Sequence, residues 1–476
     1  MTLVSNTLKL SLAFIITKIL SLFWNIYLTR LFADNLDELG IYVFVITQFS
    51  IFSIIAEGNI SYAVQHFVSI GQLNKKEAIN EYWSFSFFSK LITSLTCSFA
   101  LFLVIIIQVP DYFLSAVLIS LNLFVYTIGT SPNALFICFN KFNPLVISNI
   151  LNISIFTILG VVFLTYFKDL NYALFAMLIG NFIHTAYMLF YGFNEFKGLD
   201  GLKKLPLQLS NILLKFCLPV AIFSFCSTFM YRVDFNIFEY LLSPDLIVYL
   251  GFATMCFFIM FDLIWGQLGV VITPELIRKW SSGNNLVKEK VISQFLSLFS
   301  LFTIISIFLI IGLKFFGNFF FTFLLGEDGD FFKIIPLLNN LIFSTPFFLG
   351  FSFLYRLYLV EYSTYKLMIY SLIFIFIKLF LTLILPKDYV FAYSTLITSF
   401  TLLLVCLSLM LMKSLKIYRK AIFSSFFKSL LVIIILYIFS SNWFGFDFLK
   451  LNIVLSLLII MFGYFMFKRN LNSFFK

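Results

Sequence analysis

Long apolar segments alternate with short polar ones along almost the whole chain. Segments of about 18 to 25 mainly apolar residues cross a bilayer as helices, because lipid offers no partners for backbone polar groups. Such segments lie near residues 8–32, 39–66, 84–108, 111–138, 145–167, 171–192, 212–242, 246–275, 291–313, 332–355, 367–386, 389–412, 421–441 and 450–467. The pattern therefore predicts an all-α integral membrane protein with about fourteen transmembrane helices.

The predicted helices fall into two groups. The longest inner connection, residues 193–211, separates the first six helices from the remaining eight. The same pattern recurs on both sides of this connection: a helix with interior cations, a short outer loop, and then a helix with one interior acid. Such pseudo-repeats are common in secondary transporters. We therefore expect an N-terminal lobe at 1–198, a C-terminal lobe at 199–415, and two extra helices at 416–476.

Composition agrees with a membrane protein. Of 476 residues, 61% are hydrophobic and 11% are charged, whereas about a quarter of a soluble domain is charged. A soluble chain of this length cannot bury so much apolar surface, which excludes a soluble enzyme. The first apolar segment is too long for a signal-peptide core, so we expect it to be retained. The six cysteines lie in apolar runs without a CxxC pair, which predicts small core residues.

The net charge of +10 is explained by orientation. With both termini cytoplasmic, most lysines and arginines fall in inner loops and most acids fall in outer loops, as the positive-inside rule requires. The basic charge therefore requires no nucleic-acid partner. We expect the inner loops to contact anionic membrane lipids.

Eight ionisable residues remain inside the predicted spans: Lys18, Glu57, Lys90, Arg232, Asp234, Glu239, Asp262 and Lys378. Each costs at least about 2.5–3.5 kcal/mol at the centre of a helix in lipid, so we expect them to face the bundle interior or an aqueous cavity. Lys90, about two turns inside its predicted helix, is expected instead to reach the inner surface. Lys18 shares a polar stripe with Asn25, which predicts a cavity-lining cation; the alternative is a buried pair with Glu57. For Lys378 an internal ion pair is an equal alternative.

Few other residues indicate chemistry. Prolines interrupt several spans, and at Pro132 and Pro219 a bend can act as a hinge. His66 and His184 lie near helix ends and are predicted to be packing residues. The sequence has no GxGxxG, GxxxxGK[ST], HExxH or CxxC motif. We therefore expect no cofactor and no metal, and the sequence favours transport over catalysis.

Two stretches resemble the multidrug/oligosaccharidyl-lipid/polysaccharide exporter superfamily and, within it, the bacterial O-antigen and capsule flippases. In residues 23–52 a first helix ends on Arg30, and an acidic turn precedes Gly-Ile-Tyr and a second helix with a glutamine. In residues 230–253, Arg232 and Asp234 precede a turn and Tyr249, with Val248 in place of the usual glycine. The stretch VVITPELIRKW, which contains Pro274, is also similar to the family.

The resemblance implies a MATE-like fold in a bacterial inner membrane, with two lobes that alternate between inward- and outward-open states. It implies a polyprenyl-diphosphate-linked oligosaccharide as substrate, with a glycan polymerase and chain-length machinery as candidate partners. The residues expected to bind substrate are Lys18, Asn25, Arg30, Arg232 and Lys378, since cations suit a diphosphate. The residues expected to couple ions or to gate are Glu57, Asp234, Glu239 and Asp262.

Other functions remain open. A lipid-linked peptidoglycan precursor flippase also needs a cationic cavity, and the sequence barely separates it from a flippase for a lipid-linked oligosaccharide. A drug or cation antiporter of the same superfamily would prefer an acidic cavity, which the mixed charges disfavour. A membrane glycan polymerase or glycosyltransferase usually needs a large outer loop, and the outer loops here are short. The sugar composition of the substrate, the coupling ion and the oligomeric state are left open.

Overall fold

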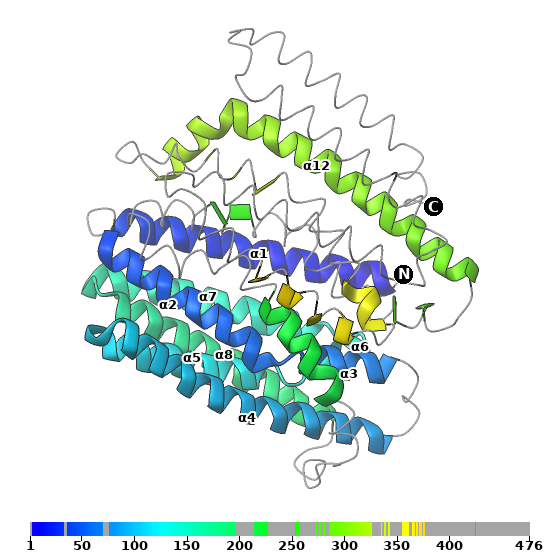
Figure 1. Ribbon diagram of the computed structural model, residues 1–476. Helices are drawn as coiled ribbons and strands as arrows, with labels where there is room; N and C mark the ends of the chain where they lie inside the picture. The colour runs from blue at the N-terminus through cyan, green and yellow to red at the C-terminus, as the bar shows by residue number, and fades with distance from the viewer. Residues whose placement is uncertain are drawn as a thin grey trace. The chain divides into compact units, whose positions relative to one another are not determined.

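The computed structural model describes residues 2–32, 36–69, 76–196, 214–226 and 285–325, with short pieces between residues 253 and 376 and residue 424. These residues are almost entirely helical (Figure 1). Seven segments among them are long and apolar enough to cross a membrane: Leu12–Leu31, Glu38–Ser69, Ile79–Gln108, Pro110–Cys138, Asn143–Phe167, Leu170–Glu195 and Val287–Leu309. They confirm the all-helical class and the first six and the ninth of the predicted spans, with ends that differ by a few residues.

The chain divides into two compact units. The first comprises Met1–Val248, Ile259–Arg278 and Leu359–Ile375, and the second comprises Tyr249–Phe258, Lys279–Tyr358 and Phe376–Lys476. In the first unit the labelled elements are α1 (Thr2–Leu31), α2 (Leu36–Glu57), α3 (Ile60–Ser69), α4 (Lys76–Gln108), η1 (Pro110–Tyr112), α5 (Phe113–Gly129), α6 (Asn133–Cys138), α7 (Asn143–Phe167) and α8 (Leu170–Glu195). An unlabelled helix, Leu214–Cys226, belongs to the same unit. The labelled helix of the second unit is α12 (Asn285–Leu325).

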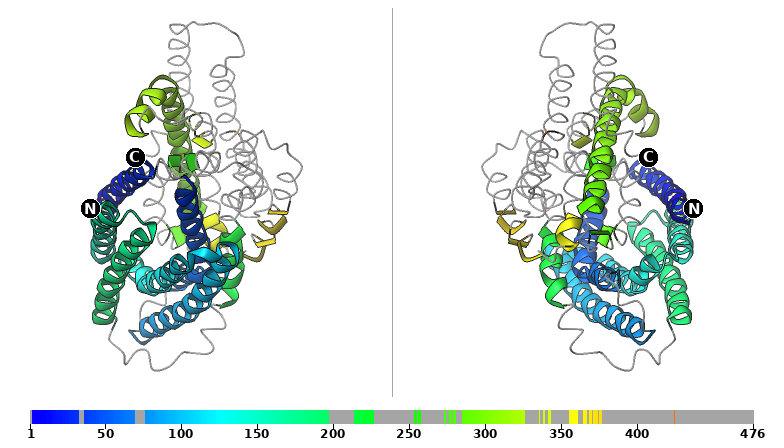
Figure 2. Two further views of the ribbon diagram at one scale, coloured as in Figure 1. Left: turned by 90° about the vertical axis from the view of Figure 1, so that its left-hand side faces the viewer. Right: turned by 90° about the vertical axis from the view of Figure 1, so that its right-hand side faces the viewer.

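The helices of the first unit form a closely packed bundle. Helix α7 packs against α8 and α1, α5 lies between α4 and α8, and α2 contacts α4 and α5. Figure 2 shows α7 and α8 at one side of this bundle and the helix Leu214–Cys226 at the other. Large apolar side chains such as Trp24, Leu28 and Leu123 fill the centre. The outward sides stay apolar, as a lipid-facing surface requires.

Asparagine side chains join three of these helices. Asn181 donates from Nδ2 to Asn122 Oδ1 at 2.7 Å, and Asn152 donates from Nδ2 to Asn181 Oδ1 at 3.0 Å. Asn122 in turn donates to the Leu174 carbonyl at 3.0 Å. Since apolar burial does not drive helices together within lipid, such interhelical hydrogen bonds and close packing fix α5, α7 and α8 against one another.

Two of the spans are interrupted. The second span breaks between α2 and α3 at Gly58 and Asn59, whose φ angles are +53° and +51°. Glycine and asparagine tolerate this left-handed conformation better than other residues, so the segment 39–66 is two helices rather than the one that the hydrophobic pattern predicted. The fourth span breaks between Gly129 and Asn133. Pro132 lies in this second break, which confirms the predicted bend because proline has no N–H to continue the helix.

The predicted packing residues are confirmed where the structure describes them. Cys138, Cys217, Cys226 and Cys256 are buried, Cys97 is partly buried, and all five are free thiols. His66 is buried and stacks on Phe216 with 5.0 Å between ring centroids. His184 is also buried and stacks on Tyr126 at 5.9 Å. Cys406 lies outside the described residues.

Gly160 provides a test of the bundle, because a methyl group there would lie 2.5 Å from Cζ3 of the Trp24 ring. We expect Gly160→Ala to lower the free energy of unfolding by about 1–3 kcal/mol, since overpacking separates α1 from α7. Gly40→Ala is the control, because its added methyl group meets no atom within 4 Å. Thermal unfolding of the purified protein measures both. An unchanged midpoint in Gly160→Ala would contradict this packing.

Candidate functional site

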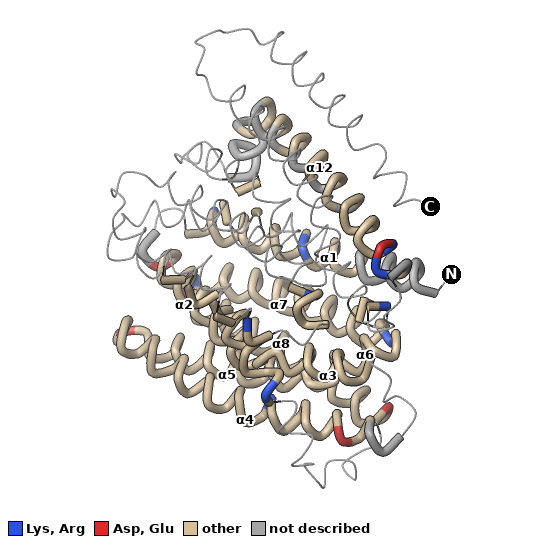
Figure 3. The backbone as a smooth tube through the Cα atoms, turned by 45° about the vertical axis from the view of Figure 1, so that its right-hand side comes forward, with Lys and Arg blue, Asp and Glu red and all other residues tan. Residues whose placement is uncertain are grey.

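Charged residues are sparse along the described helices of Figure 3, and most of the tube is uncharged. Lys90 is the largest departure from the sequence-based expectation, because its side chain is fully buried, at 0% exposure. The prediction that it reaches the inner surface is wrong. Helix α4 begins at Lys76, well before the predicted start at residue 84, so Lys90 lies about 21 Å along this helix. Because the side chain is fully buried, its ammonium must find partners inside the protein.

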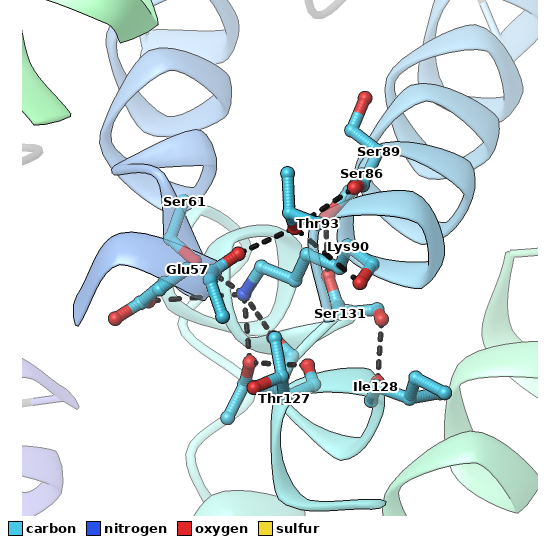
Figure 4. Close-up of polar contacts among 11 residues, drawn as sticks. Glu57, Ser61, Ser86, Ser89, Lys90, Thr93, Thr127, Ile128 and Ser131 are labelled. Atoms are coloured by element: carbon cyan, nitrogen blue, oxygen red, sulfur yellow. Dashed lines mark hydrogen bonds and ion pairs between the residues drawn. The ribbon is translucent and has the colours of Figure 1, made fainter. Parts of the chain in front are cut away.

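Those partners are three hydrogen-bond acceptors. Lys90 Nζ donates to Ser61 Oγ at 2.9 Å, to the Thr130 carbonyl at 3.1 Å and to Thr130 Oγ1 at 2.8 Å. An ammonium group has three donors and no acceptor, so these bonds satisfy it completely. Figure 4 shows the lysine side chain extending from α4 toward Ser61 of α3 and toward the end of α5.

Glu57 supplies the opposite charge. Its Oε1 lies 3.7 Å from Lys90 Nζ, and Ser61 donates to the same oxygen at 3.0 Å. Ser61 therefore accepts from the lysine and donates to the carboxylate, which links the two charges. The Glu57 side chain remains 46% exposed. Removal of either partner would leave the charge of the other uncompensated. The cost is larger when Glu57 is removed, because the charge that remains is then the fully buried lysine.

The pair lies where the two interrupted spans meet. Glu57 and Ser61 flank the break between α2 and α3, and Thr130 lies in the break between α5 and α6. Helix α4 also contacts both breaks through hydroxyls: Thr93 donates to the Ala56 carbonyl at 2.5 Å, and Ser86 donates to the Ser131 carbonyl at 2.7 Å. Interrupted membrane helices with polar residues at the break are a common location of transport sites.

A further hydrogen bond connects the first break to the helix Leu214–Cys226. Asn59 Nδ2 donates to the Val220 carbonyl at 3.2 Å, and both groups are buried. The polar cluster of Glu57, Ser61, Lys90 and Thr130, which we call the Lys90 cluster, therefore lies next to a hydrogen bond that attaches the helix Leu214–Cys226 to the first break.

The predicted site residues of α1 lie apart from these hydrogen bonds. Lys18 is partly buried, and its ammonium lies 4.9 Å from the centroid of the Phe14 ring. Asn25 is partly buried and donates to the Ser21 carbonyl of its own helix at 2.7 Å. Arg30 is exposed in the last turn of α1, where a cation is favoured by the helix dipole. The sequence offered a buried pair of Lys18 with Glu57 as the alternative for Lys18. In the described geometry, Glu57 forms an ion pair with Lys90.

The remaining predicted site residues are Arg232, Asp234, Glu239, Asp262 and Lys378, and they lie outside the described residues. Sequence reasoning assigned no role to Asn59, Thr93 or Thr130. The dipeptide Gly58-Asn59 was an available signal, since it marks a turn inside an apolar segment. The hydroxyl residues gave no comparable signal, because serine and threonine are frequent in membrane helices.

The chemistry available to the Lys90 cluster is charge pairing and exchange of hydrogen bonds. The cluster contains one positive and one negative side chain where two interrupted spans meet. The helical segments on the two sides of each break can change their orientation separately. Within the described ranges, no three His, Cys, Asp or Glu side chains gather in a group suited to a metal ion. The cluster is therefore described as a polar junction between helices.

Comparison with known proteins relates this architecture to a family. The profile of the family described as "Polysaccharide biosynthesis protein" matches residues 3–255. Among solved structures, the eukaryotic MATE transporter AtDTX14 is similar at 13% identity, covering 89% of this chain and 97% of that one, with a TM-score of 0.67. No curated protein sequence matches the chain.

Two further solved structures have the same fold. The lipid II flippase MurJ, in an inward closed conformation, is 17% identical over 97% of this chain and 99% of its own, with a TM-score of 0.64. A MOP superfamily transporter from Pyrococcus furiosus is 12% identical over 85% of this chain and 94% of its own, with a TM-score of 0.65. At such identities these similarities establish the fold alone. The family match spans more than half of the chain, so the protein is a multi-pass helical membrane protein that belongs to the polysaccharide biosynthesis protein family and has the fold of the MATE and MurJ structures.

Proposed function

We propose that the protein is a flippase that moves a polyprenyl-diphosphate-linked oligosaccharide, an O-antigen or capsule repeat unit of lipopolysaccharide or capsule synthesis, from the cytoplasmic to the outer leaflet. Transport proceeds by alternating access and is coupled to an ion or to the membrane potential. The observation that carries the proposal is the Lys90–Glu57 pair at the meeting point of two interrupted spans. A junction of this kind supports two alternative arrangements of the helices, because the pair can exchange its hydrogen bonds as the breaks bend.

The proposed architecture extends the described part. Fourteen transmembrane helices form two six-helix lobes, at 1–198 and 199–415, followed by two helices at 416–476. The protein lies in a bacterial inner membrane with both termini in the cytoplasm, which the distribution of lysine and arginine supports. A glycan polymerase and chain-length machinery act on the product and are the proposed partners.

The proposed substrate-binding residues are Lys18, Asn25, Arg30, Arg232 and Lys378. Cations suit the diphosphate, and Lys18 lies inside the first span, where a charge is costly unless it has a role. The proposed coupling or gating residues are Glu57, Asp234, Glu239 and Asp262. Glu57 has the strongest support, since its carboxylate is half exposed and yet belongs to the Lys90 cluster.

The test of this function uses the purified protein in liposomes that contain a lipid-linked oligosaccharide. We expect protein-dependent appearance of the glycan on the opposite leaflet, measured by its accessibility to an added glycosidase. Arg232→Ala should abolish this transfer while the protein still inserts, because a fork-shaped guanidinium binds phosphate in a way that alanine cannot replace. Normal transfer by Arg232→Ala would contradict the assignment of Arg232, and no transfer by the native protein would contradict the function.

The second candidate is a flippase for a lipid-linked peptidoglycan precursor. The observation that favours it is the nearly complete mutual coverage with the lipid II flippase MurJ. Parallel liposomes with lipid II as the only lipid-linked substrate distinguish the two candidates. Faster transfer of lipid II than of the oligosaccharide would favour the second candidate.

A further inference from the structure

An apolar pocket of about 410 Å³ lies beside the break between α2 and α3. Ile55, Gly58 and Ile60 line it from the break, and Ser89 and Thr93 line it from α4. The opposite wall is one side of the helix Leu214–Cys226 and consists of Leu214, Cys217, Leu218, Ala221, Ile222 and Phe225. The volume falls in the range of small-molecule sites, about 300–1,000 Å³.

The α4 wall of the pocket lies near the middle of the third span. The third span begins at Ile79, so Ser89 and Thr93 lie roughly 15–21 Å along a helix that crosses a core about 30 Å thick. Lipid headgroups remain at the surface of that core. Only hydrocarbon chains are abundant at the depth of this pocket.

The side of the pocket formed by the helix Leu214–Cys226 continues into an exposed apolar surface. Leu214 and Leu218 are 52% and 65% exposed, and Ile92, next to Thr93, is 63% exposed. Few lining groups need hydrogen bonds from a ligand, since the Thr93 hydroxyl already donates to the Ala56 carbonyl. The surroundings therefore select a ligand without polar groups.

The walls of the pocket are connected to each other. Asn59 donates to the Val220 carbonyl, and His66 of α3 stacks on Phe216, so the helix Leu214–Cys226 is attached to the segment that follows the break. A chain in the pocket would lie between this helix and α4 and would support the break from one side. An empty apolar cavity of this size would instead forgo those contacts.

We propose that the pocket binds one acyl chain of a membrane phospholipid by its terminal carbons. Phospholipid is the hydrocarbon present at the highest concentration around a membrane span, and a ligand in excess fills its site by mass action. The bound chain stabilises the conformation in which Asn59 contacts Val220. This role is independent of which substrate the protein transports.

The test uses the full-length protein in phospholipid nanodiscs that contain phosphatidylcholine with a photoreactive diazirine. One probe carries the diazirine at the terminal carbon of an acyl chain, and the other carries it near the headgroup. After illumination, peptide mapping by mass spectrometry locates the labelled residues. We expect the terminal probe to label the segments 89–93 and 214–225 and the other probe to label helix ends.

Ala221→Phe fills the pocket from its wall and should lower terminal-probe labelling of these segments about tenfold, the change expected when two methylene groups are no longer buried. Ala186→Phe is the matched control, because Ala186 is exposed on α8, far along the sequence from the pocket. Ala221→Leu is the milder variant if Ala221→Phe does not fold. Labelling that survives both Ala221 variants would overturn the proposal. Loss of the label on addition of a few mole per cent of polyprenyl phosphate would assign the pocket to an isoprenoid chain and would also overturn it.

Discussion

Replacement of Lys90 by methionine is expected to destabilise the protein by about 1–3 kcal/mol, because it leaves three acceptors inside the bundle without their donor and the half-exposed Glu57 carboxylate without its partner. Methionine fills a similar volume but provides no donor for Ser61 Oγ and the two Thr130 oxygens that accept from Lys90. A loss of this size is a large fraction of the stability of a folded domain, about 5–15 kcal/mol. The measurement is the yield of monodisperse protein after extraction, together with its thermal midpoint.

Two variants sharpen this prediction. Lys141→Met removes a lysine from the pair with Glu195, whose side chains are both exposed, and a surface pair contributes only about 0–1 kcal/mol. The double variant Lys90→Met/Glu57→Gln should recover the part of the loss that comes from the unpaired Glu57 charge. A Lys90→Met protein as stable as the native protein would contradict the described burial of the ammonium.

Replacement of Glu57 by glutamine is expected to abolish the dependence of transport on an imposed ion gradient. Glutamine keeps an oxygen that can accept from Ser61 but removes the charge that pairs with Lys90. A coupling free energy between two sites is typically about 1–3 kcal/mol, which corresponds to a stimulation of the native protein by roughly 5–150-fold. The variant should lose this stimulation. The measurement is liposome transfer of the lipid-linked oligosaccharide with and without a proton or sodium gradient.

The matched control for this variant is Glu195→Gln, which makes the same chemical change in the exposed pair with Lys141. Its transfer should respond to the gradient as the native protein does. Gradient-dependent transfer that persists in Glu57→Gln would exclude Glu57 as a coupling residue, even if the flippase function holds. A loss of protein yield in Glu57→Gln would instead indicate a structural role, which the double variant with Lys90→Met resolves.

The first six membrane spans could be predicted from sequence because each one is a continuous apolar segment of sufficient length. The interruption at Pro132 could also be predicted from sequence, since a residue without a backbone N–H interrupts the hydrogen bonds of a helix. The break at Gly58 and Asn59 was harder to predict, because the apolar pattern continues across it and the whole segment Glu38–Ser69 satisfies the hydropathy criterion as one span. Only the positive φ angles of both residues establish that the span is divided.

The location of Lys90 shows most clearly what hydropathy omits. Hydropathy placed the start of its helix near residue 84, because Lys76, Glu77 and Glu81 make the preceding turns polar. The helix nevertheless extends back to Lys76, and the lysine therefore lies deep enough to be enclosed. Its partners Ser61 and Thr130 are 29 and 40 residues away in sequence, and such neutral hydroxyls carry no signal of a distant charge.

The sequence by itself determined that the chain is a helical membrane protein, where its first six spans run, and which few charges lie within the predicted spans. The physical reason is that these features depend on local chain composition and on the cost of placing polar groups in hydrocarbon. The tertiary structure decided which of those charges meet: Glu57 pairs with Lys90, at the junction of two broken spans. Pairing depends on which helix faces contact each other over long separations along the chain, and an apolar pattern that looks alike on every helix does not specify those contacts.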